Sequence, residues 1–286
     1  MNREAYLTDG VEIAWCPGCG NFAIRQSLAR ALGILELPPE RVVLVTGIGQ
    51  AAKIVHYVNV NGFNGLHGRT VAAAAGIKVV RPDLVVIAES GDGDLYGEGG
   101  NHLIHNIRRN VGITVIAHDN RVYGLTKGQA SPTAAVGYKT RAQPFGVFSR
   151  PLHPLALAIA LDAAFVAQSF SGELERTAEL IAEGVRQRGF ALINVLHPCP
   201  SWNRVQTFAW YKERVYSVEK EGHDPRDQAA ALKLALAEGD RIPTGILYRR
   251  EGPSFEDLHP VVSRTSVALS PLPQPADLRP LLARFQ

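Results

Sequence analysis

A carboxylate and an amide that could bind one metal ion follow two separate β-branched runs of the chain. Asp92 lies between two glycines shortly after the run 84–89, and Asn120 follows the run 113–118. Hard cations such as magnesium take oxygen ligands and often bind phosphate oxygens of a second molecule. Glycines allow the backbone to approach closely, and N–H groups at a helix start attract anions. Asp92, Asn120 and a nearby backbone carbonyl could therefore hold magnesium and a diphosphate.

The spacing of these two residues favours one shared site. Gly93 and Asn120 are separated by 26 residues, 94 through 119, which is enough for a crossover helix and a return strand. Parallel strands joined in this way end at the same edge of a sheet, where open α/β sheets bind ligands. By itself, a Gly-Asp-Gly tripeptide is usually only a turn, so the strand context carries the prediction.

Apolar runs that alternate with helix-like segments predict the frame that positions these residues. This alternation is typical of a doubly wound, mainly parallel sheet in an α/β domain, with helices covering the sheet. Strands are expected at 41–46, 84–89, 113–118 and 191–196, with a weaker one at 164–168. Helices are expected at 21–32, 69–80, 99–108, 172–188 and 225–237.

Composition and charge exclude several classes of protein. The 286 residues are 46% hydrophobic and 20% charged, which is ordinary for a folded globular chain. The net charge of +3 comes without long runs of one sign, so neither nucleic acid nor a lipid surface is an expected partner. No apolar stretch approaches the ~20 residues of a membrane span, and residues 1–10 do not resemble a signal peptide. We expect a soluble, cytoplasmic protein.

Four further segments stand in an order that resembles the β subunits of 2-oxoacid:ferredoxin oxidoreductases. They are WCPGCG at 15–20, GIG at 47–49, LHGR at 66–69 and YGLTKGQ at 123–129. The Gly-Asp-Gly tripeptide and the later Asn120 are similar to the thiamine diphosphate motif. The resemblance covers residues 11–203, including HPCP at 197–200, and weakens after them.

This resemblance implies a fold, a reaction and partners. The fold would be the thiamine-diphosphate-binding type, and the reaction the oxidative decarboxylation of a 2-oxoacid, either 2-oxoglutarate or a pyruvate-like acid. Coenzyme A would accept the acyl group, and electrons would pass through an iron–sulfur cluster to ferredoxin. Thiamine diphosphate supplies the difficult carbanion chemistry, while the protein supplies positioning. In this family the carboxylate that activates the cofactor comes from a partner α subunit, so the chain alone should be inactive.

The resemblance also assigns cofactor ligands. Asp92 and Asn120 would bind magnesium through their side chains, and Val122 would bind it through its carbonyl. The other expected cofactor contacts are Gly91, Gly93, Asp94, Gly124, Leu125, Thr126 and Gln129.

Three basic side chains are candidates for catalysis or substrate binding. Lys53 and Lys127 could contact a substrate carboxylate or the diphosphate as cations, and solvated surface lysines are the alternative. His67 precedes an expected helix start, where it could hydrogen-bond the cofactor or the substrate, or only cap the helix.

Cys16, Cys19 and Cys199 resemble the ligands of one cluster. Iron–sulfur clusters favour four thiolates, and the chain has three cysteines. In the family pattern a fourth cysteine follows the GIG segment, where this chain has Gln50. A [4Fe-4S] cluster with another fourth ligand, a three-iron or labile cluster, and no cluster all remain open. A zinc site completed by a histidine such as His56 or His197 is a further alternative, as are plain thiols.

The character of the sequence changes after about residue 198, where aromatic, charged and proline residues mix irregularly. We therefore predict a thiamine-diphosphate-binding domain at 1–203 and a C-terminal extension at 204–286 that packs on the core or on the α subunit. Two other functions remain. A non-redox decarboxylase or transferase subunit would keep Asp92 and Asn120 but need no cysteines, whereas a purely structural subunit would need none of these residues.

Overall fold

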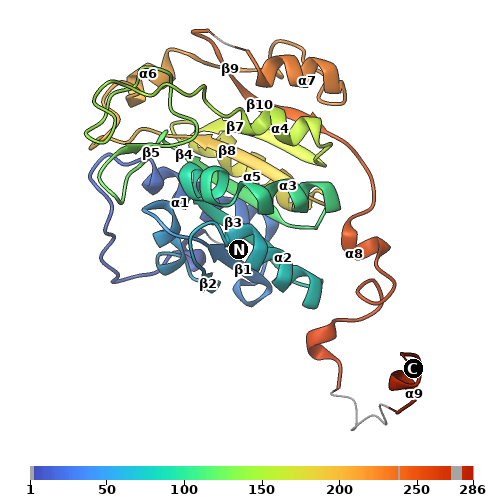
Figure 1. Cartoon of the computed structure of the whole chain (residues 1–286). Helices are drawn as coiled ribbons and strands as arrows, with labels where there is room; N and C mark the ends of the chain where they lie inside the picture. Colours follow the sequence, from blue (N-terminus) through green and yellow to red (C-terminus); the bar gives the residue numbers. More distant parts are fainter. Residues whose placement is uncertain (1–2, 238, 272–278, 286) are drawn as a thin grey trace.

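An eight-stranded sheet forms the centre of the computed structural model, which describes residues 3–237, 239–271 and 279–285 (Figure 1). The strand order is β2-β1-β3-β4-β8-β7-β10-β9, and all neighbours are parallel except the antiparallel pair β7 and β10. The strands are β1 Val42–Thr46, β2 Asn61–Asn64, β3 Val85–Gly91, β4 Thr114–Asp119, β7 Phe165–Phe170, β8 Ala191–Leu196, β9 Val215–Ser217 and β10 Ile242–Arg249. A separate two-stranded ribbon joins β5 Val122–Tyr123 to β6 Gln129–Ala130.

The central strands form because their sequences are almost continuously apolar. Every residue of β1, β4, β7 and β8 is buried, as expected of parallel strands that are covered on both faces. The five strands expected from the sequence are all present, with ends that differ by at most two residues. The predicted α/β class with a doubly wound, mainly parallel sheet is confirmed.

Helices cover the sheet on both sides and enclose two hydrophobic clusters. Side chains of α1 Asn21–Leu35 and α5 Leu174–Arg186 fill the cluster on one face. The other face is covered by α2 Thr70–Val80, α3 Gly100–Arg109, α4 Pro154–Ala160 and α7 Gln228–Ala235. Shorter helical segments are η1 Arg3–Tyr6, η2 Pro39–Arg41, η3 Ala51–His56, η4 Gly93–Glu98, α6 Phe208–Lys212, α8 Phe255–Leu258, η5 Val267–Leu269 and α9 Arg279–Leu282.

Asn110 fixes the end of α3 to two distant parts of the chain. It adopts a left-handed backbone conformation with φ 53° and ends the helix. Its Oδ1 accepts a hydrogen bond from the Phe190 backbone N–H at 2.9 Å, and its Nδ2 donates to the Pro253 carbonyl at 2.8 Å. The residue therefore holds the helix end against the start of β8 and the segment that follows β10.

The C-terminal part of the chain, predicted as an extension at 204–286 that packs on the core or on the α subunit, contributes two strands to the sheet itself. Strands β9 and β10 extend the sheet beyond β7, and Gln168 on β7 donates through Nε2 to the Pro243 carbonyl at 2.8 Å. Within this part, α7 lies between β9 and β10, which are parallel neighbours, whereas β10 runs antiparallel to β7. The division at residue 203 therefore does not separate two packing units.

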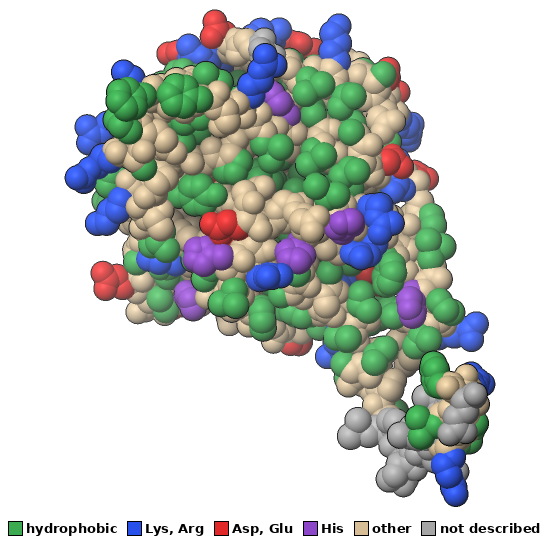
Figure 2. All heavy atoms as spheres, viewed as in Figure 1, with side chains coloured by type: hydrophobic (Ala, Val, Ile, Leu, Met, Phe, Trp, Pro, Cys, Tyr) green, Lys and Arg blue, Asp and Glu red, His purple; other side chains and the backbone are tan. Residues whose placement is uncertain are grey.

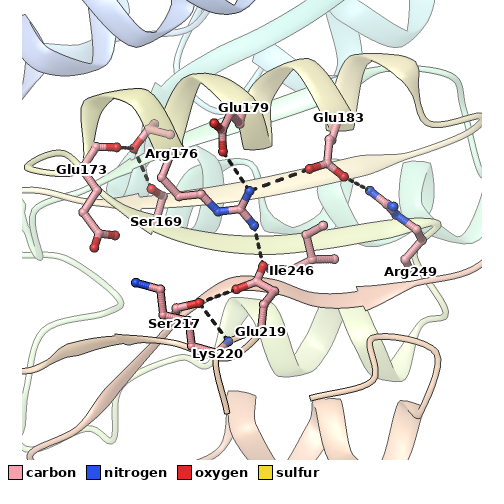
Figure 3. Close-up of polar contacts among 11 residues, drawn as sticks. Ser169, Glu173, Arg176, Glu179, Glu183, Ser217, Glu219, Lys220, Ile246 and Arg249 are labelled. Carbon is pink, nitrogen blue, oxygen red and sulfur yellow. Dashed lines mark hydrogen bonds and ion pairs between the residues drawn. The ribbon is translucent and has the colours of Figure 1, made fainter. Parts of the chain in front are cut away.

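A network of ion pairs ties this C-terminal part to α5 (Figure 3). Arg176 on α5 donates to Glu219 at 2.5 Å, and Glu219 accepts the Ile246 backbone N–H of β10 at 2.9 Å. Arg249 of β10 pairs with Glu183, further along the same helix. Two separate positions of β10 are thus anchored to one helix of the core.

After β10 the chain leaves the body of the molecule. Glu256 in α8 still accepts the Gly112 backbone N–H, at 3.0 Å to Oε2, and the following segment extends away from the sheet (Figure 1). Among the described residues, no helix is long and apolar enough to cross a membrane.

Candidate functional site

A pocket lies at the carboxyl ends of β1, β3 and β4, the edge that the sequence predicts. It encloses about 650 Å³, part of which is open to solvent. Its walls are residues 48–51 after β1, residues 91–94 and Glu98 after β3, residues 120 and 122–126 after β4, and His67. Three loops that are distant in sequence therefore meet around one space.

Most of the predicted site residues line this pocket. They are His67, Gly91, Asp92, Gly93, Asp94, Asn120, Val122, Gly124, Leu125 and Thr126. Three of the predicted catalytic or cofactor-binding residues do not line it. Lys53 lies on η3, two residues beyond the lining residue Ala51. Gln129 lies in β6, where its Nε2 donates to the Thr126 carbonyl at 2.8 Å.

Lys127, the third of these residues, is not among the residues that line the pocket. Residues 123–128 form a tight turn in which the Gly128 N–H donates to the Tyr123 carbonyl at 2.9 Å. Lys127 occupies the left-handed region of this turn, with φ 82°. It lines a different hollow, on the molecular surface.

Asp92 sits in a buried cluster of polar oxygen atoms. The Ser131 hydroxyl donates to its Oδ2 at 2.5 Å. The Thr133 hydroxyl lies 2.7 Å from the same oxygen and 2.9 Å from Asp119 Oδ1. Burial and the neighbouring Asp119 raise the pKa of Asp92 to about 8. A divalent cation would relieve this cost, because it favours the charged carboxylate.

Asn120 and Val122 line the same pocket and offer further oxygen atoms that a magnesium ion could bind. The Val122 N–H donates to Asn120 Oδ1 at 3.0 Å, which fixes the amide at the start of the loop. Asn203 holds the same loop by donating to the Asn120 carbonyl at 3.1 Å. Carboxylate, amide and carbonyl oxygens at one pocket form a donor set that magnesium prefers, so these residues fit the predicted ion.

Asp94 lines the pocket and also holds its walls together. Its Oδ1 accepts the backbone N–H groups of Ile48 at 3.3 Å and Gly68 at 2.8 Å, and its Oδ2 accepts the Thr70 hydroxyl at 3.1 Å. A Cβ at Gly47 would meet Asp94 Oδ2 at 2.1 Å, so only glycine fits there. These hydrogen bonds join the loop after β1 to the start of α2. Asp94, a predicted cofactor contact, therefore also stabilises the walls of the pocket.

His67 and Glu98 form a polar pair at the wall of the same pocket. His67 Nδ1 lies 2.7 Å from Glu98 Oε2. Both side chains are partly exposed to solvent. The pairing orients the imidazole, so that its other nitrogen is available to a bound molecule.

The three cysteines belong to two loops that the fold brings together. The Cys19 N–H donates to the Cys16 carbonyl at 3.0 Å, and the Gly20 N–H donates to the Pro198 carbonyl at 3.4 Å, next to Cys199. Burial, opposed by the Asn21 backbone N–H, and then the sulfurs of Cys199 and Cys16 raise the pKa of Cys19 to about 11. All three thiols are free.

The spacing of these thiols differs from that of a zinc site. Four ligands at about 2.3 Å from a tetrahedral zinc would place sulfurs about 3.8 Å apart. Within the described ranges, His67, Asp94 and Glu98 form the one group of potential ligands whose atoms all lie within 4.8 Å of each other. The three sulfurs do not form such a group in this structure.

Gln50, at the position of the expected cysteine, lies between the cysteine loop and the pocket. Its carbonyl accepts the Trp15 indole N–H at 2.7 Å, directly before Cys16. Its Oε1 is buried and has no hydrogen-bond partner among the described residues. The Gln50 side chain therefore offers an oxygen without a hydrogen-bond partner between the pocket and the cysteine loop.

A buried polar relay connects the sheet with the cysteine loop. His118 Nε2 lies 2.6 Å from Glu89 Oε1, and His118 Nδ1 lies 2.8 Å from Asn21 Oδ1, two residues after Cys19. Burial raises the pKa of Glu89 to about 8 and lowers that of His118 to about 3. At neutral pH both groups are therefore uncharged, with the Glu89 carboxyl donating to the imidazole.

Several residues of the site give no signal in the sequence. Ser131 and Thr133 hold Asp92, but they stand in a loop 39 and 41 residues after it and follow no strong strand. Glu98 also lines the pocket, from a segment whose turn the sequence does not specify. The Ser-Pro-Thr segment at 131–133 is the feature that could have marked the first two, because such residues favour turns.

Comparison with known proteins agrees with this geometry. Residues 27–195 match the family model described as "Thiamine pyrophosphate enzyme, C-terminal TPP binding domain". Residues 199–264 match the family model for the C-terminal part of the β subunit of pyruvate ferredoxin oxidoreductase. Fold, pocket and family models together define a thiamine-diphosphate-binding oxidoreductase subunit.

Individual relatives narrow the class. The chain is 43% identical over 256 residues to the "2-oxoacid:ferredoxin oxidoreductase 2, subunit beta" of Aeropyrum pernix, covering 86% of this chain and 83% of the relative. It is 38% identical over 251 residues to the "2-oxoglutarate synthase subunit KorB" of Methanocaldococcus jannaschii, covering 87% and 93%. The chain belongs to the β subunits of 2-oxoacid:ferredoxin oxidoreductases, which confirms the family predicted from the sequence.

A solved structure matches the whole fold. The 2-oxoglutarate:ferredoxin oxidoreductase of Magnetococcus marinus, with 2-oxoglutarate, coenzyme A and succinyl-CoA bound, superposes with a TM-score of 0.90 at 34% identity. The match covers 100% of this chain and 96% of that one.

Proposed function

We propose that this β subunit holds thiamine diphosphate through a magnesium ion in the pocket at the ends of β1, β3 and β4. Asp92, Asn120 and the Val122 carbonyl would bind the ion, and Ser131 and Thr133 would orient Asp92. The observation that carries this proposal is the buried Asp92 beside Asp119, whose raised pKa calls for a cation. When bound, thiamine diphosphate supplies the carbanion chemistry of decarboxylation.

The proposed reaction is the oxidative decarboxylation of a 2-oxoacid. The bond between the carboxylate and the oxo carbon breaks and carbon dioxide leaves. Two electrons pass one at a time to two molecules of oxidised ferredoxin, and the acyl group joins the sulfur of coenzyme A with release of its proton. A 2-oxoglutarate substrate is supported by the bound molecules of the Magnetococcus marinus relative.

The residues of this chain would position the reactants. Asp94 keeps the loop after β1 and the start of α2 in place around the pocket. His67, oriented by Glu98 through Nδ1, would hydrogen-bond the substrate or cofactor through Nε2. Lys53, on η3 two residues beyond the lining residue Ala51, remains the candidate for a substrate carboxylate once the site is closed by the α subunit.

Cofactor binding tests the magnesium site directly. Calorimetric titration of thiamine diphosphate into the αβ complex should show magnesium-dependent binding, and Asp92→Ala should abolish it. The exposed Asp224→Asn should leave it unchanged and serves as the matched control. Normal binding by the Asp92 variant would contradict the proposed site.

We also propose that Cys16, Cys19 and Cys199 hold an iron–sulfur cluster, of the [4Fe-4S] type if Gln50 or another group completes it. The hydrogen bond from the Gly20 N–H to the Pro198 carbonyl, which brings the two cysteine loops together, supports a site shared by the three thiols. Iron and acid-labile sulfide near four each per αβ pair are expected after anaerobic purification. Absence of both would favour the second candidate function, a non-redox thiamine diphosphate subunit. The observation that favours this candidate is Gln50 at the position of the fourth cysteine.

The proposed partners are the α subunit, which would complete the open side of the pocket, and ferredoxin. We place the complex in the cytoplasm, because free thiols and an iron–sulfur cluster require a reducing compartment.

A further inference from the structure

A basic hollow lies on the surface beside the cysteine loops. It encloses about 820 Å³, including open solvent. Its lining residues are Lys127, Gly128, Tyr138, Lys139, Thr140, Arg141, Pro144, Ser201, Trp202 and Arg204. Four of these lining residues are cations and none is a carboxylate. The hollow therefore presents a field of one sign, which attracts anionic groups.

The four cations are not neutralised by the protein. Lys127, Lys139, Arg141 and Arg204 are all exposed, and none forms an ion pair with any residue in the described ranges. Figure 2 shows Lys and Arg side chains along the left margin, over the loops that follow β5 in Figure 1. Unpaired charges of one sign repel each other, so a partner of opposite charge would stabilise this surface.

The hollow shares a wall with the cysteine site. Ser201, one of its lining residues, donates to Cys16 Sγ at 3.1 Å. Burial and then the nearby Cys199 sulfur raise the pKa of Tyr138, another lining residue. Cys16 itself is exposed. An electron leaving a cluster on these thiols would therefore reach the surface close to this hollow.

The surface around the hollow is held in shape. The Tyr138 hydroxyl donates to the Trp202 carbonyl at 2.7 Å. A Cβ at Gly128, where φ is +95°, would meet the Trp202 side chain at 2.9 Å, so the turn packs closely on the indole. Trp202 remains 37% exposed. An aromatic side chain and arginines within one rigid surface are features of protein interfaces.

We propose that this hollow docks an acidic one-electron carrier protein, so that the carrier receives electrons from the cluster at Cys16, Cys19 and Cys199. This inference rests on the proposed electron-transfer function. The charges would steer an acidic carrier toward the surface and raise its association rate. A protein fits better than a small anion because the four cations are exposed around an open hollow.

Charge reversal in the αβ holoenzyme tests the proposal. The triple variant Lys139→Glu, Arg141→Glu, Arg204→Glu should raise the KM for an acidic ferredoxin roughly tenfold or more at low salt. Reduction of methyl viologen, a small acceptor that needs no docking surface, and the iron content should stay unchanged. The matched control Arg108→Glu, Arg109→Glu, Lys233→Glu carries the same charge change at exposed positions on α3 and α7 and should leave the ferredoxin KM unchanged.

A glutamine triple variant at positions 139, 141 and 204 should give an intermediate ferredoxin KM, and added salt should raise the wild-type KM toward that of the variants. An unchanged ferredoxin KM in both triple variants would overturn the proposal. It would also be overturned by an increased KM for coenzyme A alone, or by failure of the variants to assemble with the α subunit. Wild-type holoenzyme that lacks iron and does not reduce viologen would instead refute the proposed function.

Discussion

At the scale of single residues, the site depends on side chains that hydrogen-bond to the proposed metal ligands. Thr133 places one hydroxyl between Asp92 and Asp119, two buried carboxylates that would otherwise face each other. Hydrogen-bond partners of a metal ligand commonly affect the affinity for the metal, because they fix the direction of the ligand's lone pairs.

Replacement of this hydroxyl should weaken magnesium binding. Thr133→Val keeps the shape but leaves Asp92 without one of its two hydroxyl donors. We expect the magnesium-dependent affinity for thiamine diphosphate to fall roughly tenfold or more, measured by calorimetry on the αβ complex. Thr265→Val, at an exposed position of the C-terminal segment, is the control. Equal affinities of the two variants would show that Thr133 does not orient Asp92.

The buried pair Glu89 and His118 should make stability depend on pH. The folded pair retains one proton between its two pKa values, about 3 for His118 and about 8 for Glu89. In the unfolded chain the pKa is about 6.5 for His118 and about 4.3 for Glu89. The folded state therefore binds fewer protons from pH 3 to ~4.3 and more protons from ~6.5 to 8. Stability should rise with pH in the first window and fall in the second.

Glu89→Gln should remove the fall at high pH. The amide can still donate to the imidazole, but it has no proton to lose, so the wild type should lose up to about 2 kcal/mol relative to the variant between pH 6.5 and 8. Urea unfolding of both proteins across this range measures the difference. Parallel curves would mean that Glu89 does not hold a proton in the folded state.

At the scale of elements, one residue at the end of α3 holds two other segments of the chain in place. Asn110 combines a left-handed backbone with two hydrogen bonds to other segments. Asn tolerates this conformation better than most residues, since its short polar side chain bonds locally.

Substitution at Asn110 should separate these two contributions. Asn110→Ala loses both hydrogen bonds, leaves the Phe190 N–H unpaired and strains the backbone, for an expected loss of about 3 kcal/mol. Asn110→Gly loses the hydrogen bonds without the strain and should be about 1 kcal/mol more stable than the alanine variant. Denaturant unfolding of the purified chain gives both values. A glycine variant no more stable than the alanine variant would contradict the role of the backbone.

The elements also show which parts of the fold can be predicted from a sequence. β1, β4, β7 and β8 are recognisable because burial on both faces makes them continuously apolar. β2, with the sequence Asn-Gly-Phe-Asn and every residue exposed, lacks that signal and forms only by pairing with β1. β10 pairs with the nearby β9 on one side, but on the other side with β7, a strand more than seventy residues earlier, and no local pattern indicates that second pairing.

The site was predictable to the same extent and for a related reason. Asp92 and Asn120 follow recognisable strands, so their convergence could be inferred from topology. Lys127 lines the surface hollow and not the pocket, and it lies in a turn with a left-handed backbone that the sequence does not indicate. Ser131 and Thr133 reach Asp92 from a loop whose path depends on tertiary packing.

At the scale of the whole molecule, the pocket is open and should require the α subunit. Its acidic lining residues Asp92, Asp94 and Glu98 all hydrogen-bond to other groups of this chain. The carboxylate that activates the cofactor would therefore come from the α subunit. We expect the isolated chain to show no oxidation of 2-oxoglutarate with viologen as acceptor, and addition of the α subunit to restore it. Activity of the isolated chain at a rate near that of the complex would contradict this expectation.

The late return of β10 to the sheet has a consequence for biosynthesis. Until β10 pairs with it, β7 is an edge strand with unpaired backbone groups, and such edges are prone to wrong association. β7 ends at residue 170 and β10 at residue 249, so 79 more residues must leave the ribosome first. At about 5–20 residues per second, this interval lasts roughly 4–16 seconds. A newly made chain would thus carry an open sheet edge for several seconds, a period in which chaperones that shield nascent chains can determine the yield of folded protein.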